Sequence, residues 1–278
     1  SSILRKSRKL LAGLLTAAAV LTGFFRLGAG DTAGPVLVTR VIDGDTVELE
    51  GGERLRLIGV DTPETYRKDR DTFVYDPMPL SKEASALTGE LIEQSESCRL
   101  EPGTQPRDRY RRRLGYLFCR AGSEQEYFVN RQLLEKGLAV LNVIAPNVEY
   151  KTDLWQAQER ARKAGTGIWA LQTVPAEEAG RYIGQIRTVR GRVVSAWRGK
   201  SVVLLNFGKD YKTDFTIVIR EEALPFFEQA GVDPVTAYNG KQVEITGRIT
   251  EYNGPQAGAG IPEQIRVLGD TQGWPATR

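Results

Sequence analysis

Two tight turns in residues 37–60 constrain the fold of this chain more than any other feature. Asp-Gly-Asp at 43–45 and Gly-Gly at 51–52 separate three strand-like runs, at 37–42, 46–50 and 54–60. Alternation of apolar and polar residues is typical of half-buried strands, and paired glycines favour a hairpin turn. Three successive strands joined in this way predict a meander or a small barrel.

The next part of the chain mixes helices with strands. We expect a linker at 31–36, a loop at 66–80, a helix capped by Ser81, strands at 97–101 and 114–120, and helices at 127–136 and 148–164. Further strands are expected at 185–197, 201–206, 213–220, 241–250 and 264–268, with a helix at 221–230. This later order of three strands, a helix and two strands is that of an OB-fold barrel. The fold class is therefore mainly β with α.

These elements predict two domains, which the chain length allows. The first covers residues 36–170 and the second, a small OB-like barrel, covers 183–268. Residues 171–182 are expected to be a linker, and residues 269–278 a disordered tail.

The N-terminal 30 residues have the composition of an export signal. Basic residues at 5–9 precede an uncharged apolar run at 10–25, and small residues follow at 28–30. Basic, apolar and then small is the order of a signal peptide. A retained membrane anchor is the second interpretation and a buried core helix the third. The first two place the rest of the chain outside the cytoplasm, as a periplasmic, secreted or membrane-anchored protein.

Composition excludes several kinds of catalytic site. The 278 residues contain no histidine, which removes catalytic triads and histidine-bound metals. Two cysteines are too few for a cysteine-rich zinc site. The net charge of +3 is too small to indicate by itself that the protein binds nucleic acid, so any basic binding surface must be local. The two cysteines, Cys98 and Cys119, lie in strand-like runs, and either a cross-strand disulfide or two buried thiols fits the sequence.

One cluster of charged residues combines groups that bind a metal with groups that bind a phosphate. Asp45 follows the first turn, and Asp61 ends the third strand-like run. Two carboxylates with a carbonyl and waters suit Ca²⁺ or Mg²⁺. Glu64 can deprotonate a water, and the planar fork of Arg56 can hold a phosphate. The alternative is a hairpin with aspartates in its turns and surface ion pairs.

Three motifs resemble those of the staphylococcal nuclease (thermonuclease) family. They lie at residues 42–46, 56–65 and 108–112, with the sequences IDGDT, RLIGVDTPET and DRYRR. Two shorter matches, GLA at 137–139 and GIW at 167–169, extend the resemblance over about residues 36–170. The resemblance implies a five-stranded OB-type barrel with three helices. It also implies a nuclease that uses Ca²⁺ to hydrolyse phosphodiesters in DNA and RNA, leaving 3′-phosphate ends.

The resemblance also assigns roles to residues of this chain. The implied calcium ligands are Asp45, Asp61 and the carbonyl of Thr62, with Asp43 acting electrostatically behind them. The implied catalytic residues are Arg56, Glu64 and Arg112, and the implied nucleotide contacts are Arg109 and Tyr110.

The sequence departs from the family pattern near the third motif. Arg111 and Arg113 stand where glycines are expected. The family's pair of tyrosines that flank the nucleotide is not evident, and residues 143–145 are Val-Ile-Ala. The loop at 66–80 is longer than in the simplest members.

The second domain lacks a comparable cluster. A basic groove with stacking aromatics would be formed by Lys200, Lys209, Lys212, Arg220, Arg248, Phe207, Tyr211 and Tyr252. Surface and core positions of a barrel are the alternative reading of the same residues. Three function classes therefore compete: an active calcium-dependent nuclease, a catalytically weak or dead nucleic-acid-binding protein of the same fold, and a cell-surface scaffold. The presence of Arg56, Glu64 and Arg112 favours the enzyme, with nucleic acid as its partner and no obligate protein partner.

Overall fold

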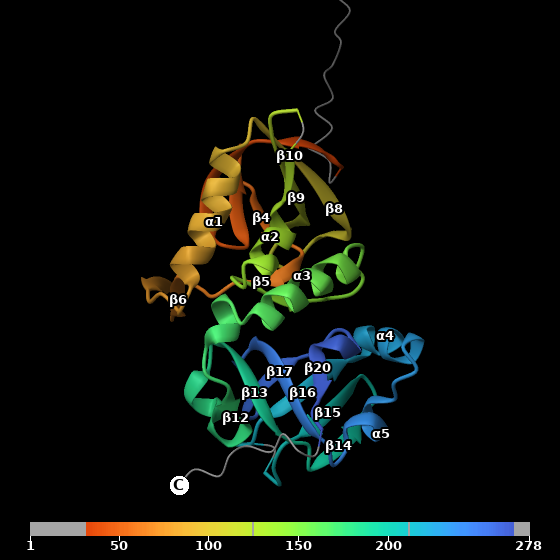
Figure 1. The fold of residues 1–278 in the computed structure, drawn as a ribbon. Helices are drawn as coiled ribbons and strands as arrows, with labels where there is room; N and C mark the ends of the chain where they lie inside the picture. Colours follow the sequence, from red (N-terminus) through yellow and green to blue (C-terminus); the bar gives the residue numbers. More distant parts are fainter. Residues whose placement is uncertain (1–31, 124, 211, 270–278) are drawn as a thin grey trace, which may run out of the picture. The chain divides into compact units, whose positions relative to one another are not determined.

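The computed structural model describes residues 32–123, 125–210 and 212–269 (Figure 1). The expected signal or anchor segment and nearly all of the expected tail lie outside these ranges. Residues from Asp31 onward form one compact unit. None of the helices within the described ranges combines the length and apolar character needed to cross a membrane.

The N-terminal half, from β1 to η1, is a curved, strand-rich sheet covered by helices (Figure 1). Its main sheet has the strand order β1-β8-β9-β4-β3-β2, and β10 also pairs with β9. The strands are β1 (Gly34–Val36), β2 (Val38–Asp43), β3 (Thr46–Leu49), β4 (Arg54–Leu57), β8 (Ser97–Arg107), β9 (Arg113–Ala121) and β10 (Gln125–Phe128). Two smaller pairs are β5 (Gly59–Asp61) with β11 (Val140–Asn142) and β6 (Tyr66–Asp69) with β7 (Thr72–Tyr75). The helices are α1 (Ser81–Glu93), α2 (Val129–Glu135), α3 (Lys151–Ala164) and the 3-10 helix η1 (Gly167–Ala170). The expected mixture of strands and helices is confirmed.

The meander predicted from the two turns is present, but its third strand is shorter than predicted. Strands β2, β3 and β4 pair antiparallel in sequence, as expected. The run 54–60 is not one strand, because the chain turns at Ile58 and β5 pairs with β11 instead. Gly59 has φ +77°, and a Cβ there would lie 2.4 Å from Leu154 Cδ1, so only glycine fits this turn.

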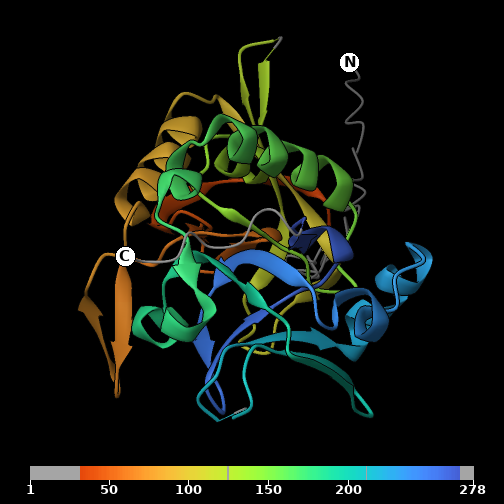
Figure 2. The ribbon, with the colours of Figure 1, turned by 60° about the horizontal axis from the view of Figure 1, so that its bottom comes forward.

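Four other local predictions are wrong. The expected linker at 31–36 contains β1, which pairs with β8. The expected loop at 66–80 contains the β6–β7 hairpin, which projects from the sheet in both ribbon views (Figures 1 and 2). Strand β8 continues through the expected turn after Glu101 to Arg107, with an irregularity in its pairing. Ser81 is the first helical residue rather than the cap, and its buried hydroxyl has no hydrogen-bond partner.

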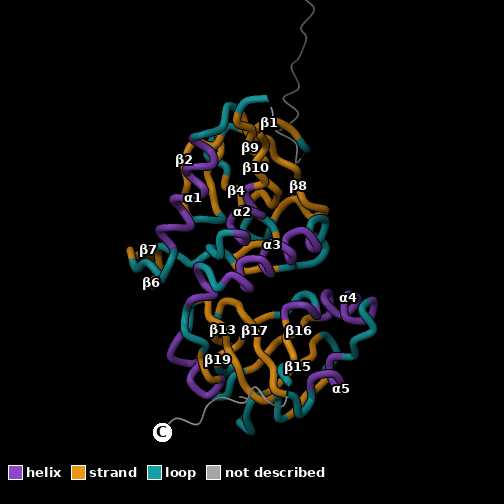
Figure 3. The backbone as a smooth tube through the Cα atoms, in the orientation of Figure 1, coloured by secondary structure: helices purple, strands orange, loops and turns teal. Residues whose placement is uncertain are grey.

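The C-terminal half, from β12 to β20, has its own hydrophobic cluster, built around side chains such as Phe215, Ile217 and Phe227. One sheet has the order β12-β13-β17-β20 and the other the order β14-β15-β16-β19-β18. The strands are β12 (Val174–Pro175), β13 (Ile186–Arg192), β14 (Ser195–Arg198), β15 (Val202–Asn206), β16 (Thr216–Arg220), β17 (Gln242–Arg248), β18 (Thr250–Glu251), β19 (Pro255–Gly258) and β20 (Ile265–Val267). The helices are η2 (Ala176–Tyr182), η3 (Glu221–Ala223), α4 (Leu224–Gln229), α5 (Pro234–Tyr238) and η4 (Pro262–Gln264). Figure 3 shows α4 and α5 at one edge of these strands.

The segment expected to link the halves is ordered. It contains β12 and η2, and Ala176 and Ala179 of η2 are buried in the second cluster. Ile261, near the end of the chain, is instead buried in the first cluster. The Gln264 side chain donates a hydrogen bond from Nε2 to the carbonyl of Leu141 in β11, at 3.0 Å. The contacts of Ile261 and Gln264 cross from the C-terminal half to the N-terminal half. The predicted domain boundaries at 36–170 and 183–268 therefore stay a prediction.

The two cysteines face each other across β8 and β9. Cys98 and Cys119 are register partners, and a disulfide bond joins them. Both side chains are buried in the first hydrophobic cluster.

Candidate active site

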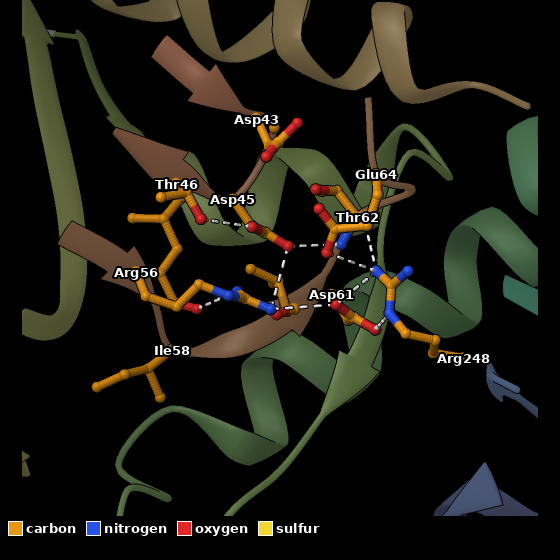
Figure 4. A network of polar contacts seen from close by, with 12 residues as sticks. Asp43, Asp45, Thr46, Arg56, Ile58, Asp61, Thr62, Glu64 and Arg248 are labelled. Atoms are coloured by element: carbon orange, nitrogen blue, oxygen red, sulfur yellow. Dashed lines mark hydrogen bonds and ion pairs between the residues drawn. The ribbon is translucent and has the colours of Figure 1, made fainter. Parts of the chain in front are cut away.

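Asp45 is fixed at the turn between β2 and β3 (Figure 4). Its Oδ2 accepts a hydrogen bond from the backbone N–H of Thr62 at 2.7 Å, and its Oδ1 accepts one from the Thr46 hydroxyl at 3.0 Å. The turn is pressed against α1, because a Cβ on Gly44 would lie 2.7 Å from Ala84 Cβ. A Cβ there would also lie 2.9 Å from Thr62 Cγ2, so a larger residue than glycine at this position would push the turn away from both neighbours.

Arg56 of β4 joins Asp45 to Asp61 of β5. Its Nη2 lies 3.1 Å from Asp45 Oδ2 and 3.1 Å from Asp61 Oδ1. Its Nη1 donates to the carbonyls of Leu57 and Val60, at 2.9 and 2.8 Å. The turn at Ile58 therefore folds Asp61 back onto the arginine five residues before it. This pairing is buried, which distinguishes it from the surface ion pairs that the sequence left as an alternative.

Asp43 and Glu64 lie beside this pair and are partly buried. Asp43 Oδ1 accepts from the backbone N–H of Thr65 at 3.2 Å. Burial raises the pKa of Asp43, although the hydrogen bonds from Thr65 oppose the shift. Burial also raises the pKa of Glu64 to about 7; Arg248 opposes this, while neighbouring carboxylates reinforce it. A carboxylate with a pKa near neutrality can take up or release a proton at neutral pH.

Arg248, the last residue of β17, completes the cluster from the C-terminal half (Figure 4). Its guanidinium donates to both carboxylate oxygens of Asp61 and to the carbonyl of Thr62. Its Nη2 also lies 3.4 Å from Glu64 Oε1. Of the two interpretations left open for Arg248, a basic groove or ordinary barrel surface and core, neither included this contact with the carboxylates of the N-terminal half. No local pattern in the sequence around Arg248 indicated this contact.

Three described members of that expected groove have surroundings that differ from those of Arg248. Phe207 packs against Phe215, with ring centroids 5.1 Å apart, and is a partner of the second cluster. Tyr252 is exposed, and Tyr211 lies outside the described residues. Arg220 lines a cleft that also contains residues of the N-terminal half.

The third motif forms a loop held by Asp108. Asp108 Oδ1 accepts from the backbone N–H groups of Tyr110 and Arg112, and its Oδ2 accepts from Arg112 Nε at 2.7 Å. Tyr110 is exposed, and the guanidinium carbons of Arg109 and Arg112 lie 4.8 and 5.7 Å from its ring centroid. These contacts give the loop a defined shape that presents Tyr110 and Arg112 to solvent.

The two unexpected arginines of this loop differ in their surroundings. Arg113 is 7% exposed, and its Nη1 lies 3.8 Å from Glu53 Oε2. Its side chain is therefore packed inside the protein and is not part of a basic surface. Arg111 is exposed and has φ +65°, the left-handed region where glycine is favoured. The backbone conformation explains why glycine is expected there, and the loop keeps that conformation with arginine at some cost in strain.

We therefore expect Arg111→Gly to raise the free energy of unfolding by about 1 kcal/mol, because glycine adopts a positive φ without strain. Urea unfolding followed by circular dichroism measures the change. Arg109→Gly is the matched control: Arg109 does not have a positive φ, so the same substitution should destabilise the protein. A loss of stability in Arg111→Gly would contradict this account of the strain.

A cleft of about 680 Å³ adjoins the cluster. It is lined by Arg56, Leu57, Ile58, Gly59, Val60, Gln105, Asp108, Arg109, Tyr110, Arg112, Leu114, Asn142, Ile144, Ala145, Asn147, Arg220 and Glu222. Arg56 and Arg112 share this cleft, in which Arg112 is paired with Asp108 and Arg56 with Asp45 and Asp61. Ile144 is 60% exposed and stands in the segment that lacks the expected tyrosines.

The oxygen atoms of the cluster suit a hard cation. Nowhere in the described ranges do three or more histidine, cysteine, aspartate or glutamate side chains gather as a metal site. Two carboxylates and a main-chain carbonyl do converge, and a positively charged group, the Arg248 guanidinium, already binds Asp61 and Thr62 there. Oxygen donors of this kind fit Ca²⁺ or Mg²⁺, which complete their coordination with water.

Comparison with known proteins places this chain in a family. Residues 54–171 match the family model described as staphylococcal nuclease homologue. The chain is 37% identical over 151 residues to the thermonuclease of Staphylococcus intermedius, which covers 53% of this chain and 83% of that protein. It is 39% identical over 136 residues to the thermonuclease of Staphylococcus hyicus, covering 48% and 74% respectively. It is 31% identical over 140 residues to endonuclease YncB of Bacillus subtilis, covering 49% and 61%. The chain therefore belongs to the staphylococcal nuclease family.

Proposed function

We propose that this protein is a calcium-dependent nuclease with an OB-type barrel. It would hydrolyse phosphodiester bonds in DNA, RNA or both and leave 3′-phosphate ends. The observation that carries this proposal is the buried junction of Asp45, Arg56 and Asp61 beside Glu64. The family membership supports hydrolysis by a nuclease, and the thermonuclease and endonuclease names of its relatives support the substrate class.

The cleft supports binding of a nucleic-acid strand. Arg56 and Arg112 both line the cleft, and a guanidinium can hold a phosphate oxygen. Both Nη atoms of Arg56 donate to groups of the chain, so Arg56 would exchange at least one of these bonds for a phosphate oxygen. Tyr110 offers an exposed ring on which a base can stack, and Ile144 offers an apolar surface in place of a second ring. Arg109 holds the Tyr110 hydroxyl with a 2.7 Å hydrogen bond, which orients the ring. An exposed aromatic ring beside two arginines can bind both the base and the phosphate of a nucleotide. An isolated phosphate would use only the arginines.

The chemistry follows from the charges of the cluster. Asp45, Asp61 and the Thr62 carbonyl would hold Ca²⁺, which when bound would neutralise charge on the phosphate and orient a water. Glu64 takes the proton of the attacking water, and its pKa near neutrality suits that task. Arg56 and Arg112 stabilise the additional negative charge on the phosphate in the transition state. Asp43 adds negative charge behind these groups without a hydrogen bond to the arginines.

Export of the chain stays part of the proposal. It rests on the order of basic, apolar and small residues in the first 30 positions, which lie outside the described residues.

The same OB-type assignment is proposed for the C-terminal half, on the order of its strands and helices.

A substrate assay with and without a chelator tests the proposed function. Labelled single- and double-stranded DNA and RNA are incubated with the full chain in Ca²⁺ or in excess EGTA, and product ends are identified by their sensitivity to a 3′-phosphatase. We expect cleavage in Ca²⁺ only, with 3′-phosphate ends. Binding of all substrates without cleavage would instead identify a nucleic-acid-binding module of the same fold.

A further inference from the structure

The Arg248 guanidinium lies among the oxygens proposed for the metal (Figure 4). Its Nε and Nη2 donate to the two oxygens of Asp61, at 3.0 Å each. Its Nη2 also donates to the carbonyl of Thr62 at 2.7 Å. The side chain is only 18% exposed. Two of the three groups proposed as metal ligands therefore already bind a cation that the chain itself supplies.

The C-terminal half holds this arginine in place from behind. Its Nη1 donates to the carbonyl of Gly184 at 2.9 Å, just before β13. Strand β17 is paired on both sides, with β13 and β20. Ile186 of β13 is buried with Val140 of β11 and Ile168 of η1, which brings the two halves together beside Arg248. The position of the guanidinium thus follows from packed strands, unlike that of a surface side chain that samples many rotamers.

A divalent cation and this guanidinium would compete for the same oxygen atoms, those of the Asp61 carboxylate and the Thr62 carbonyl. Bidentate pairing with an arginine engages both oxygens of a carboxylate, and the oxygen of Thr62 accepts a third hydrogen bond from the same group. Ca²⁺ needs these oxygens at shorter distances than a hydrogen bond allows. Two cations placed at neighbouring sites in a partly buried cluster also repel each other strongly. A metal bound to Asp61 and the Thr62 carbonyl would therefore weaken the hydrogen bonds that these groups accept from Arg248.

We propose that Arg248 is an internal cation that competes with the divalent metal for Asp61 and the Thr62 carbonyl, so that the C-terminal half sets the metal affinity of the site. The inference rests on the proposed metal-dependent function. It assigns the C-terminal half a role that differs from binding nucleic acid through a basic groove. Metal binding and the pairing of Arg248 with Asp61 are then antagonistic.

If Arg248 positions Asp61 instead of competing with the metal, the expected change in metal affinity has the opposite sign. If Arg248 only positioned Asp61 for the metal, its removal would leave the carboxylate misplaced and weaken metal binding. If Arg248 competes, its removal strengthens metal binding. The sign of the change in affinity therefore separates the two roles, and catalytic activity is not needed to read it.

Calorimetric titration of the full chain with CaCl₂ provides the test, using the wild type, Arg248→Met and Arg187→Met. Methionine keeps an apolar stem and removes the charge. We expect at least about a tenfold lower Kd for Ca²⁺ in Arg248→Met, because a neighbouring positive charge is removed. Arg187 lies on β13, opposite Gly247 of β17, and its guanidinium binds Gln185. Arg187→Met should therefore leave the Kd unchanged.

Thermal unfolding gives a second measurement on the same proteins. Without metal, Arg248→Met should melt at a lower temperature than the wild type, because Asp61 loses its bidentate partner. Added Ca²⁺ should raise the melting temperature more in Arg248→Met than in the wild type, because tighter binding stabilises the folded state more. Arg248→Lys keeps the charge without the bidentate fork, and should have an intermediate Kd; it also serves if the methionine variant does not fold.

The outcomes separate this inference from the proposed function. Calcium binding that is equal or weaker in Arg248→Met, or in Arg248→Lys if that variant alone folds, overturns the competition and leaves the calcium-dependent nuclease intact. An absence of calcium binding in the wild type and in both variants at millimolar calcium overturns both. Binding that appears only when Arg248 is replaced supports the competition in its strongest form.

Discussion

Replacing Glu64 by glutamine is expected to lower kcat for phosphodiester hydrolysis by about a thousandfold, because the amide cannot take a proton from water. The side chain keeps its size, so the fold and the position of β5 should not change. Initial rates on a labelled oligonucleotide in saturating Ca²⁺ measure the effect. The raised pKa of Glu64, about 7, adds a second expectation. The wild-type rate should fall at acidic pH as Glu64 takes up a proton, at a pH below that value because bound Ca²⁺ favours the carboxylate, and this acidic limb should be absent from the residual activity of the variant.

A matched control for this substitution is Glu83→Gln. Glu83 lies in the first turn of α1 and is exposed, outside the cluster, so its replacement should leave the rate unchanged. Wild-type rates in Glu64→Gln, with unfolding behaviour that matches the parent protein, would remove Glu64 from the proposed mechanism and leave its raised pKa without a catalytic use.

Arg112→Ala has the second large expected effect, a loss of about 10²- to 10³-fold in kcat. The guanidinium lines the cleft and is oriented by Asp108, so alanine removes a positive charge that faces the phosphate. Arg112→Lys should recover only part of the loss, because an ammonium group cannot form two parallel bonds to a phosphate. Single-turnover rates separate this effect on chemistry from any change in substrate binding.

Arg120→Ala is the control for the loss of one arginine from the same region. Arg120 lies on β9, is exposed, and its Nη2 is 3.7 Å from Glu126 Oε1, away from the cleft lining. Equal rates in Arg112→Ala and Arg120→Ala would show that Arg112 does not act on the phosphate.

Local sequence signals predicted the elements that depend on neighbouring residues. The Gly51-Gly52 turn and the alternation on either side of it predicted β3 and the start of β4. The end of α3 was also predicted, because Gly165 is left-handed there and closes the helix. These features require only a few adjacent residues, so their sequence pattern carries most of the information.

The same signals failed where a distant segment decides the local conformation. The break at Ile58 depends on β11, which supplies the partner strand for β5, and on Leu154, which leaves no room for a side chain at Gly59. The β6–β7 hairpin was missed because Tyr66, Phe73 and Tyr75 are exposed, and prolines flank the segment in the sequence. Alternation of buried and exposed residues cannot reveal a hairpin whose faces are both exposed.

The sequence was enough to group Asp45, Arg56 and Asp61 as one site, because they lie in adjacent motifs, but it did not predict the turn at Ile58 that folds Asp61 onto Arg56. Asp45, Arg56 and Asp61 lie within 17 residues, and two turns bring them into contact. The entry of Arg248, 187 residues after Asp61, into the same cluster could be seen only in the folded chain. A turn is specified by local backbone conformation, which residue types constrain. The approach of β17 depends on the packing of two complete sheets, and no local pattern near Arg248 specifies it.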